Sequence, residues 1–216
     1  MKILQLLLIS ILVPTGLFAQ DAKAKAILDE LSKNTKSYSS MEAQFEYQML
    51  NKADDIDEKQ EGKLLSKGAK YRLNIAGQVV LSDGKTVWTV LTDAEEVQVN
   101  DVPEEDDSGE FISPSNILNL WEKGFKYKYD SETNLDGKAV DVINLYPIEA
   151  KEKSFHTIKL YINKDRSGVL RIEIKGKDGT DYIYTIKNFK VNQTVTDQKF
   201  VFSAEEFPNF DVIDLR

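Results

Sequence analysis

The sequence predicts a mainly β protein in which about 10 or 11 short antiparallel strands form a meander that curls toward a barrel. Apolar and polar residues alternate through most of the chain, and turn signals separate these stretches at regular spacing. Two stretches have helical spacing instead, one near the N-terminus and one in the middle. Because each predicted strand has one polar face, the apolar faces must converge on one interior, which the helices are available to cover.

Composition limits the class of protein and the class of partner. The chain has 216 residues, no cysteine and a formal net charge of -8, and its isoelectric point is about 4.9. This length is typical of a single β domain, and the acidic balance argues against a nucleic-acid partner because it repels phosphate backbones. Without cysteine, the chain has neither a disulfide framework nor a lipid-bearing cysteine at its start.

The first 19 residues have the three-part pattern of a secretory signal peptide. Lys2 gives a positive start, residues 3–13 are almost purely apolar, and Ala19 offers a small residue for cleavage. We therefore expect cleavage after Ala19, with residues 20–216 forming a single exported domain. A retained N-terminal anchor is the alternative, but the apolar run is short for a membrane-spanning helix.

Residues 21–36 are predicted to form an amphipathic helix with Asp21 as its N-cap. Ala24, Ile27, Leu28 and Leu31 recur at helical spacing between lysines and acids. The apolar stripe is narrow, which indicates a helix that lies on a surface.

Period-two alternation begins after this helix. Phe45, Tyr47 and Met49 share one face of a strand whose other face is polar. After a polar turn and the stretch 60–65, residues 69–76 alternate again, with an apolar face of Tyr71, Leu73 and Ile75.

The stretch 79–88 is predicted to form a β-hairpin. Asp83-Gly84 between apolar runs favours a two-residue type I′ turn. That turn would place Leu81 opposite Thr86 and Val79 opposite Trp88. A further strand is expected at 95–99.

The alternation stops at residue 100, and an acidic loop is followed by a short apolar helix. Four successive acids at 104–107 could hold calcium, but they lack the ligand spacing of a calcium loop, so a solvated loop is favoured. Ser113-Pro114 is a helix start, and Gly124 marks the end. The apolar residues of the predicted helix are Ile117, Leu118, Leu120 and Trp121.

Strands return from residue 125 to the end of the chain. Apolar residues alternate in the stretches 125–129, 139–146, 156–163, 170–174 and 182–186, with Asp-Gly turns at 136–137 and 178–179. Ile158, Leu160 and Ile172 lie on their apolar faces.

Few residues suggest catalysis. The single histidine, His156, opens a predicted strand without a local partner, so a structural role is favoured. We expect no enzymatic activity, no cofactor and no metal site. The abundant aliphatic and aromatic residues fit either an ordinary core or a cavity lined for acyl chains, and the pattern alone leaves both open.

Several motifs in order resemble the periplasmic outer-membrane lipoprotein carrier family (LolA-like). After the signal peptide and first helix, the resemblance rests on sequence stretches at 60–64 (Gln-Glu-Gly-Lys-Leu), 71–73 (Tyr-Arg-Leu), 81–88 (Leu-Ser-Asp-Gly-Lys-Thr-Val-Trp), 113–114 (Ser-Pro) and 199–202 (Lys-Phe-Val-Phe). It covers essentially the whole mature chain.

The resemblance implies an incomplete antiparallel β-barrel with a helical lid over a hydrophobic cavity. It implies a periplasmic, monomeric carrier that receives lipoproteins from an inner-membrane ABC transporter and delivers them, by way of a possible acceptor, to the outer membrane. Acyl chains need such an escort because each exposed CH₂ costs about 0.8 kcal/mol. The implied acyl-binding residues are Phe45, Tyr47, Met49, Tyr71, Leu73, Ile75, Leu81, Trp88, Ile117, Leu118, Leu120, Trp121, Ile158, Leu160 and Ile172.

One family feature is missing from this chain. Family members carry an Arg-Pro pair after the Glu-Gly-x-Leu strand, and that arginine holds the lid; the matching residues here are Gly68-Ala69. Arg72 is the candidate for the same latching role. The inserted helix 113–121 is expected to be the movable lid, because so short a helix must take its stability from its packing.

Two other functions on the same fold remain as alternatives. One is an envelope module that senses lipid and signals through a protein partner, and the other is a general lipid or glycolipid binder.

Overall fold

The computed structural model describes residues 16–102 and 120–216. Within these ranges it contains one α-helix, α1 (Gly16–Lys36), and a single sheet of twelve strands. The strands are β1 (Met41–Asn51), β2 (Ile56–Lys67), β3 (Lys70–Ile75), β4 (Gln78–Ser82), β5 (Thr86–Leu91), β6 (Glu96–Asp101), β7 (Phe125–Leu135), β8 (Lys138–Pro147), β9 (Phe155–Asn163), β10 (Val169–Gly176), β11 (Asp181–Val191) and β12 (Asp211–Asp214). Two short 3₁₀ helices, η1 (Leu120–Glu122) and η2 (Asp197–Phe200), complete the elements.

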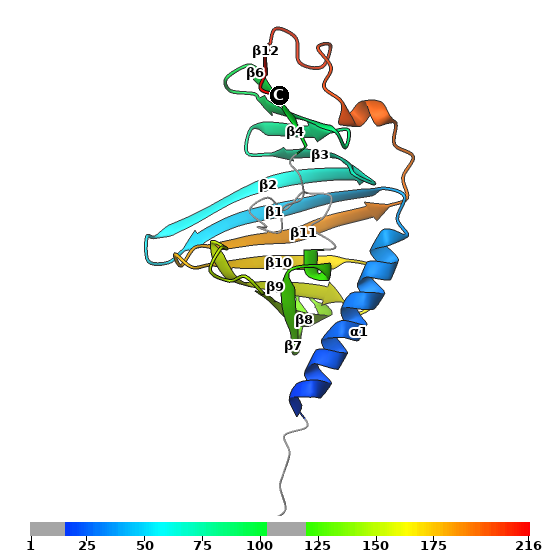
Figure 1. Cartoon of the computed structure of the whole chain (residues 1–216), viewed down its shortest axis with the longest axis vertical. Coiled ribbons are helices and arrows are strands. Elements are labelled where there is room, and N and C mark those ends of the chain that lie inside the picture. Colours follow the sequence, from blue (N-terminus) through cyan, green and yellow to red (C-terminus); the bar gives the residue numbers. More distant parts are fainter. Residues whose placement is uncertain (1–15, 103–119) are drawn as a thin grey trace, which may run out of the picture.

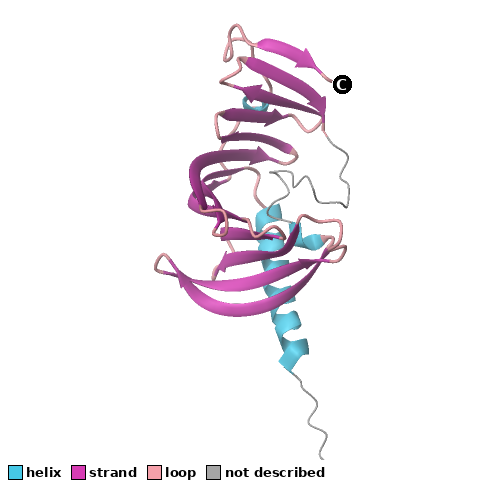
Figure 2. Cartoon of the chain, turned by 90° about the vertical axis from the view of Figure 1, so that its left-hand side faces the viewer, coloured by secondary structure: helices cyan, strands magenta, loops and turns pink. Residues whose placement is uncertain are grey.

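The sheet is open, as predicted for an incomplete barrel. Its order is β12-β6-β5-β4-β3-β2-β1-β11-β10-β9-β8-β7, so β12 and β7 are free edges at opposite ends. The first and last long strands, β1 and β11, pair in the middle and join two local meanders. Figures 1 and 2 show the resulting strongly curved sheet, with α1 across its lower half. The predicted mainly-β, unclosed fold is confirmed.

Helix α1 packs on one face of the sheet, which we call the inner face. Its predicted stripe of Ala24, Ile27, Leu28 and Leu31 is buried against aliphatic residues of β8, β9 and β10. The stripe therefore belongs to the main core rather than to a surface. The helix begins at Gly16, so the prediction of Asp21 as its N-cap is wrong.

The opposite, outer face has a smaller core that the sequence did not predict. Leu81, Val90 and Val97 are buried there, and the chain after η2 folds back over them. Three phenylalanines of this C-terminal segment, Phe202, Phe207 and Phe210, pack against the outer-face core. The same segment ends in β12, which pairs in parallel with β6. The sequence pattern predicted about 10 or 11 antiparallel strands and did not include this parallel strand.

The Asp-Gly hairpins at 83–84 and 136–137 differ in their turns. Asp136 and Gly137 both have positive φ, 50° and 83°, between paired residues Leu135 and Lys138, as a two-residue turn requires. At Asp83-Gly84 the predicted register is wrong: Leu81 pairs with Trp88 across a longer loop. There, the Asp83 carboxylate accepts hydrogen bonds from the backbone N–H groups of Lys85 (2.8 Å) and Thr86 (2.9 Å), which favours the wider turn.

Most of the inserted segment lies outside the described residues, including the acids at 104–107 and predicted lid residues 113–119. Of that predicted helix the structure describes only the start of η1, residues 120 and 121. Among the described helices, none combines the length and apolar character needed to cross a bilayer.

Candidate functional site

The inner face carries apolar side chains well beyond the area that α1 covers. Under the helix, Ile143, Leu145, Ile158, Leu160 and Ile162 are fully buried. Strand pairing continues this face through β10 and β11 to β1, β2 and β3. On these strands its apolar residues are only half-buried: Tyr47, Met49, Leu64, Leu73, Ile75, Ile174, Tyr182 and Tyr184. The inner face thus changes from a closed core to a partly open apolar surface.

Most of the described candidate residues lie on this face. Ile158, Leu160 and Ile172 belong to the buried part under α1. Tyr47, Met49, Leu73 and Ile75 belong to the half-buried part, and Phe45 and Tyr71 are buried within it.

Two candidates lie on the other face of the sheet. Leu81 and Trp88 pair with each other and pack in the outer-face core against the C-terminal segment. The strand register therefore separates them from the candidates on the inner face. Ile117 and Leu118 fall outside the described residues, and Leu120 begins η1.

The half-buried part of the inner face is built around stacked aromatic rings. The Phe45 and Tyr184 ring centroids are 6.0 Å apart, those of Tyr47 and Tyr184 are 5.2 Å apart, and those of Tyr47 and Tyr182 are 6.4 Å apart. Gly62 lies opposite Phe45 on β2, where a Cβ atom would approach the phenyl ring to 2.3 Å. The missing side chain of Gly62 therefore makes room for this ring. Tyr182 and Tyr184 were not among the candidates, because only the pairing of β11 with β1 brings them there.

Trp121 is held in the core by α1. Its side chain is 4% exposed, and its indole Nε1 donates a 3.0 Å hydrogen bond to Ser32 Oγ. Glu122 forms an ion pair with Lys36 at 2.6 Å, and the hydrogen bond from Lys36 lowers the pKa of Glu122. This end of the inserted segment is fixed to α1.

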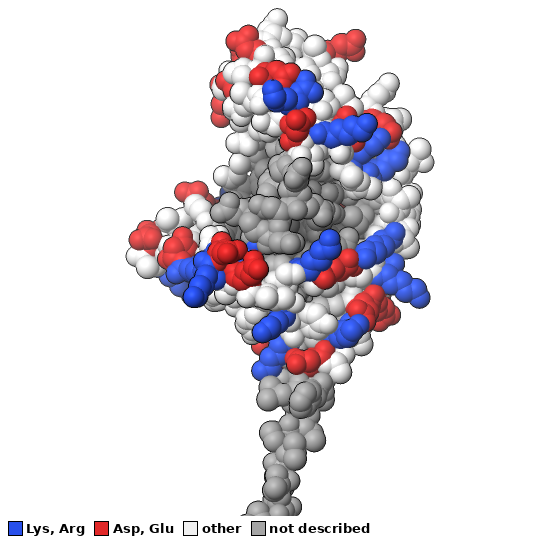
Figure 3. All heavy atoms as spheres, viewed as in Figure 1, with Lys and Arg blue, Asp and Glu red and all other residues white. Residues whose placement is uncertain are grey.

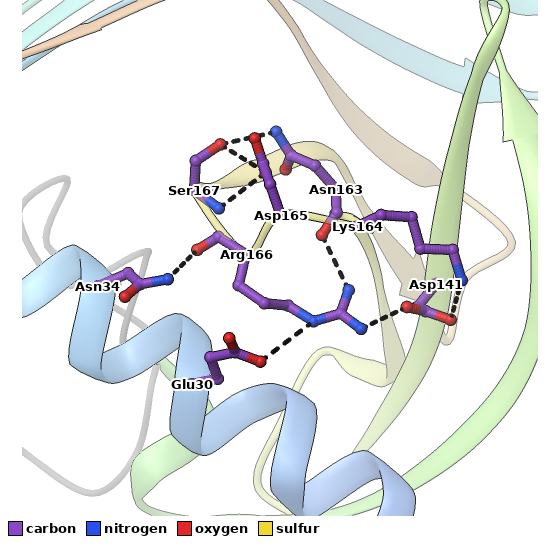
Figure 4. A network of polar contacts seen from close by, with 8 residues as sticks. All are labelled: Glu30, Asn34, Asp141, Asn163, Lys164, Asp165, Arg166 and Ser167. Carbon is purple, nitrogen blue, oxygen red and sulfur yellow. Dashed lines mark hydrogen bonds and ion pairs between the residues drawn. The ribbon is translucent and has the colours of Figure 1, made fainter.

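A buried ionic network ties α1 to the sheet (Figure 4). Asp141 is 1% exposed. Its Oδ1 accepts hydrogen bonds from Tyr129 (3.0 Å) and Lys164 (2.8 Å), and its Oδ2 forms an ion pair with Arg166 at 2.7 Å. Burial alone would raise the pKa of Asp141, but the hydrogen bonds from Lys164, Arg166 and Tyr129 outweigh it, so this pKa is lowered. No sequence signal marked Asp141, which lies between Val140 and Val142 on β8.

The same network reaches the helix through Arg166. Its guanidinium lies 3.9 Å from Glu30, and its backbone carbonyl accepts a 3.1 Å hydrogen bond from Asn34. The side chain of Lys23, also on α1, lies 3.6 Å from the ring centroid of Tyr129. These contacts orient the helix over the inner face.

Arg72, the latch candidate, lies on the outer face. It pairs with Leu81 in the register of β3 and β4, and its guanidinium bonds the carboxylate of Glu206 in the C-terminal segment, at 3.0 Å for Nη1. Lys67 and Lys70 likewise pair with Asp197, at 2.8 and 2.6 Å. Arg72 therefore holds the C-terminal segment, and a role toward residues 103–119 stays a prediction.

A cleft of about 520 Å³ lies where β2 continues beyond the end of β3. Phe45 and Ile75 are the candidates that line it, and its other walls include polar residues such as Lys63, Asn74, Thr92 and Lys187. A bulge at Gln44, where the pairing of β1 with β11 shifts, also contributes to this cleft. It is therefore mixed in character, because Phe45 and Ile75 belong to the inner face whereas Lys63 and Asn74 pair with each other on the outer face.

The surface charges favour no polyanionic partner. On the face seen in Figure 3, acidic and basic side chains are interspersed above and below the centre, without a continuous basic area among the described residues. His156 is exposed, and its Nδ1 lies 2.9 Å from Thr157 Oγ1.

Comparison with solved structures supports the fold. The chain resembles an uncharacterized conserved protein from Thermus thermophilus, with a TM-score of 0.59 and 14% identity, over 88% of this chain and 98% of that one. Two further structures are a putative outer membrane lipoprotein-sorting protein domain from Vibrio parahaemolyticus (TM-score 0.47, 11% identity, covering 83% and 97%) and the Mycobacterium tuberculosis lipoprotein LppX (TM-score 0.48, 14% identity, covering 80% and 98%). The first of these three structures, with its TM-score of 0.59, supports the fold.

Comparison with sequences identifies the family. No curated protein sequence matches the chain. The family described as "Outer membrane lipoprotein carrier protein LolA" matches residues 36–203, which run from the end of α1 into the C-terminal segment and include every strand except β12. The chain therefore belongs to the LolA family of outer membrane lipoprotein carrier proteins.

Proposed function

We propose that this protein binds the acyl chains of lipoproteins on its inner face and carries them through the periplasm to the outer membrane. The observation that carries the proposal is the half-buried apolar surface that extends the core beyond α1. A monomeric domain needs a reason to leave such a surface partly open, because a contiguous exposed apolar area is a ligand or partner site in most soluble proteins. Membership of the LolA family supports acyl chains as that ligand.

The candidate acyl-binding residues sort by position on this surface. Tyr47, Met49, Leu73 and Ile75 would contact a ligand directly, and Phe45 and Tyr71 would form the floor beneath it. The buried Ile158, Leu160, Ile172 and Trp121 support the surface from the core. Ile117, Leu118 and Leu120 remain candidates for a cover over it.

We infer that the chain is exported with residues 1–19 as a signal peptide and that residues 20–216 form one periplasmic domain. Cleavage after Ala19 would shorten α1 by four residues, from Gly16 to Ala19. From residue 21 onward, the first buried residue of the helix is Ala24, so the mature protein would keep every described core contact of α1. The mass of the protein recovered from the periplasmic fraction tests this start site.

The proposed cycle contains no chemical reaction and no cofactor. An inner-membrane ABC transporter would supply the lipoprotein, and an outer-membrane acceptor would remove it. Both partners follow from the family rather than from a described contact. The charges of the described surface support a protein or lipid partner rather than a nucleic acid.

Release of a lipoprotein from membranes is the direct test. Inner-membrane vesicles that contain the cognate transporter and a triacylated lipoprotein are mixed with the mature protein and ATP. We expect the lipoprotein to appear in the soluble fraction as a one-to-one complex. Lipoprotein that stays in the vesicles, with an active transporter, would contradict the carrier role.

The position of the site is tested with a matched pair of variants. Leu73→Asp puts a charge on the half-buried inner face, whereas Ile148→Asp puts the same charge on an exposed loop residue away from it. We expect displacement of a fluorescent fatty acid to weaken at least 10-fold for Leu73→Asp and to stay unchanged for Ile148→Asp. Mass spectrometry of lipids that copurify with the protein then distinguishes a lipoprotein carrier from a general lipid or glycolipid binder.

A further inference from the structure

Three tyrosines from two paired strands form a cluster on the half-buried inner face. Tyr47 of β1 lies opposite Tyr184 of β11, and Tyr182 lies opposite Met49 two residues further along. The Tyr47 and Tyr182 rings are nearly parallel, with 13° between their planes, and Tyr184 packs against Tyr47 on one side and Phe45 on the other. Ring stacking fixes the orientation of all three side chains.

The hydroxyl groups of these tyrosines have no partner in the part of the chain that the structure describes. By contrast, Tyr129 donates to Asp141 (3.0 Å), and Tyr38 donates to the Ser167 carbonyl (2.9 Å). Among the described tyrosines, the one hydroxyl that is fully buried without a hydrogen-bond partner is that of Tyr71, so the hydroxyls of the cluster still reach solvent. Burial, together with Tyr47 and Tyr182, raises the pKa of Tyr184 to about 12. At neutral pH Tyr184 therefore offers a neutral hydroxyl donor.

The cluster stands at a border between apolar and polar parts of the same face. On one side are Ile172 and Ile174, which pair with Tyr184 and Tyr182 in the β10–β11 register. On the other side β2 places Gln60 opposite Tyr47 and Glu58 opposite Met49, and both of these β2 residues are exposed. Tyrosine suits such a border because its ring is apolar and its hydroxyl is polar.

We propose that Tyr47, Tyr182 and Tyr184 form a hydroxyl rim that donates hydrogen bonds to the ester carbonyls joining acyl chains to glycerol. This inference rests on the proposed function and adds a ligand class to it: the site would select esterified acyl chains over hydrocarbon chains of equal length. An acylated ligand has the same order of groups as the protein surface, with hydrocarbon first, then carbonyl acceptors, then a polar remainder. If the hydrocarbon lies along Phe45 and Ile174, the carbonyls fall at the tyrosines.

Selection by the rim has a measurable size. A neutral hydrogen bond gives a net gain that corresponds to about 3- to 10-fold in affinity, since competing water must be displaced. The ester preference should therefore be about 3- to 10-fold for each hydroxyl that engages, and it should disappear when that hydroxyl is removed.

The experiment combines a change in the ligand with a change in the protein. A diacylglyceryl lipopeptide and its ether-linked analogue, with equal chains and the same peptide, are titrated against the mature wild type, Tyr47→Phe, Tyr182→Phe, Tyr184→Phe and the triple variant. Phenylalanine keeps the ring stacking and removes only the hydroxyl. Tyr161→Phe, a tyrosine on the outer face, is the matched control, and thermal melting confirms that every variant is folded.

The expected result is that wild type and Tyr161→Phe prefer the ester, while the triple variant binds both ligands with the affinity of wild type for the ether. A preference that survives in the triple variant would overturn the inference, and so would an equal loss for both ligands, which would place the hydroxyls against the peptide instead. Either of those outcomes leaves acyl binding intact. If the wild type binds neither lipopeptide, that result would instead contradict the proposed function and the inference together.

Discussion

At the residue scale, Gly62 is required by the ring that occupies its side-chain space. Gly62→Ala would place a Cβ atom 2.3 Å from Phe45 Cζ, so the phenyl ring must move out of its contact with Tyr184. We expect a loss of about 1–3 kcal/mol in unfolding free energy, as for other overpacked sites. Chemical denaturation of the purified variant measures it.

Gly168 provides the control for this substitution. A Cβ atom there would lie 3.5 Å from the Phe189 ring, an ordinary contact distance. Gly168→Ala should change the unfolding free energy by no more than about 1 kcal/mol. If both variants lose equal stability, the crowding at Phe45 is not the cause.

Asp141 should make the stability of the protein sensitive to acid. Its pKa is lowered in the folded state from the value of 3.8 that an unfolded chain would have. The carboxylate therefore contributes stability that is fully present above pH 4 and is lost as pH falls through the lowered pKa. Thermal unfolding between pH 7 and pH 2.5 should show this loss in the wild type.

Asp141→Asn separates this group from the other acids. At pH 7 the variant should lose about 3 kcal/mol, because Arg166 and Lys164 keep their charges beside a neutral side chain. It should also lose less additional stability than the wild type as pH falls below 4. An identical acid response in both proteins would show that other carboxylates dominate.

At the element scale, η1 behaves as part of the core. Trp121 belongs to the buried cluster formed by α1 and the strands β7–β10, and it donates a hydrogen bond to Ser32. We expect Trp121→Glu to destabilise the protein by about 4 kcal/mol or more, since it buries a charge without a partner. Leu118→Glu, three residues earlier, tests the lid prediction: it should weaken fatty-acid binding more than it lowers the melting temperature. Matching losses of stability in both variants would contradict a movable cover.

Strand β12 allows a test with proline at neighbouring positions. The backbone N–H of Asp211 donates to the Glu95 carbonyl (2.8 Å), and that of Leu215 donates to the Val99 carbonyl of β6 (2.9 Å). Because N–H groups alternate in direction along a strand, the N–H of Ile213 also points toward β6, whereas the N–H of Val212 points to solvent. Ile213→Pro should therefore lower the unfolding free energy by about 1–3 kcal/mol, while Val212→Pro should be close to neutral. Equal effects would show that the parallel pairing is not stable in solution.

Local patterns predicted most strands because each strand has one apolar and one polar face. The alternation of apolar and polar residues in β1 and β9 does not depend on which strands they pair with, so their buried faces were assigned correctly. The turn at Asp83 shows the limit of such rules. Asp-Gly favours a two-residue turn, but an aspartate can also accept backbone hydrogen bonds, and the sequence does not tell which effect is stronger. Strand β12 was missed because only its pairing with β6 makes it a strand.

The candidate site was predicted less completely than the fold. Leu81 and Trp88 have the same alternation as Leu73 and Ile75, and the sequence does not show that a distant C-terminal segment covers one face of β4 and β5. Tyr182 and Tyr184 became candidates only when β11 was placed beside β1. Assigning a strand face to a ligand or to the core requires knowledge of which segment covers it.

At the scale of the whole molecule, the two ends of the chain cover opposite faces of one sheet. Helix α1 covers the inner face of β7–β10, and the segment after η2 covers the outer face of β4–β6. Among the described residues, neither end of the chain covers the inner face of β1–β3 and β11. The partly open apolar surface is therefore a result of topology as well as of local sequence.

The central pairing of β1 with β11 also has a consequence for folding. Met41 pairs with Val191, so the pairing in the middle of the sheet joins residues that are 150 positions apart, whereas the strands on either side, apart from β12, pair with sequence neighbours. Such distant pairing gives slow folding, in the range of about milliseconds to seconds. In the proposed export, β1 would enter the periplasm long before β11 and would remain unpaired on that side until the rest of the chain arrives. The interval before that pairing is the stage at which this protein is most exposed to aggregation.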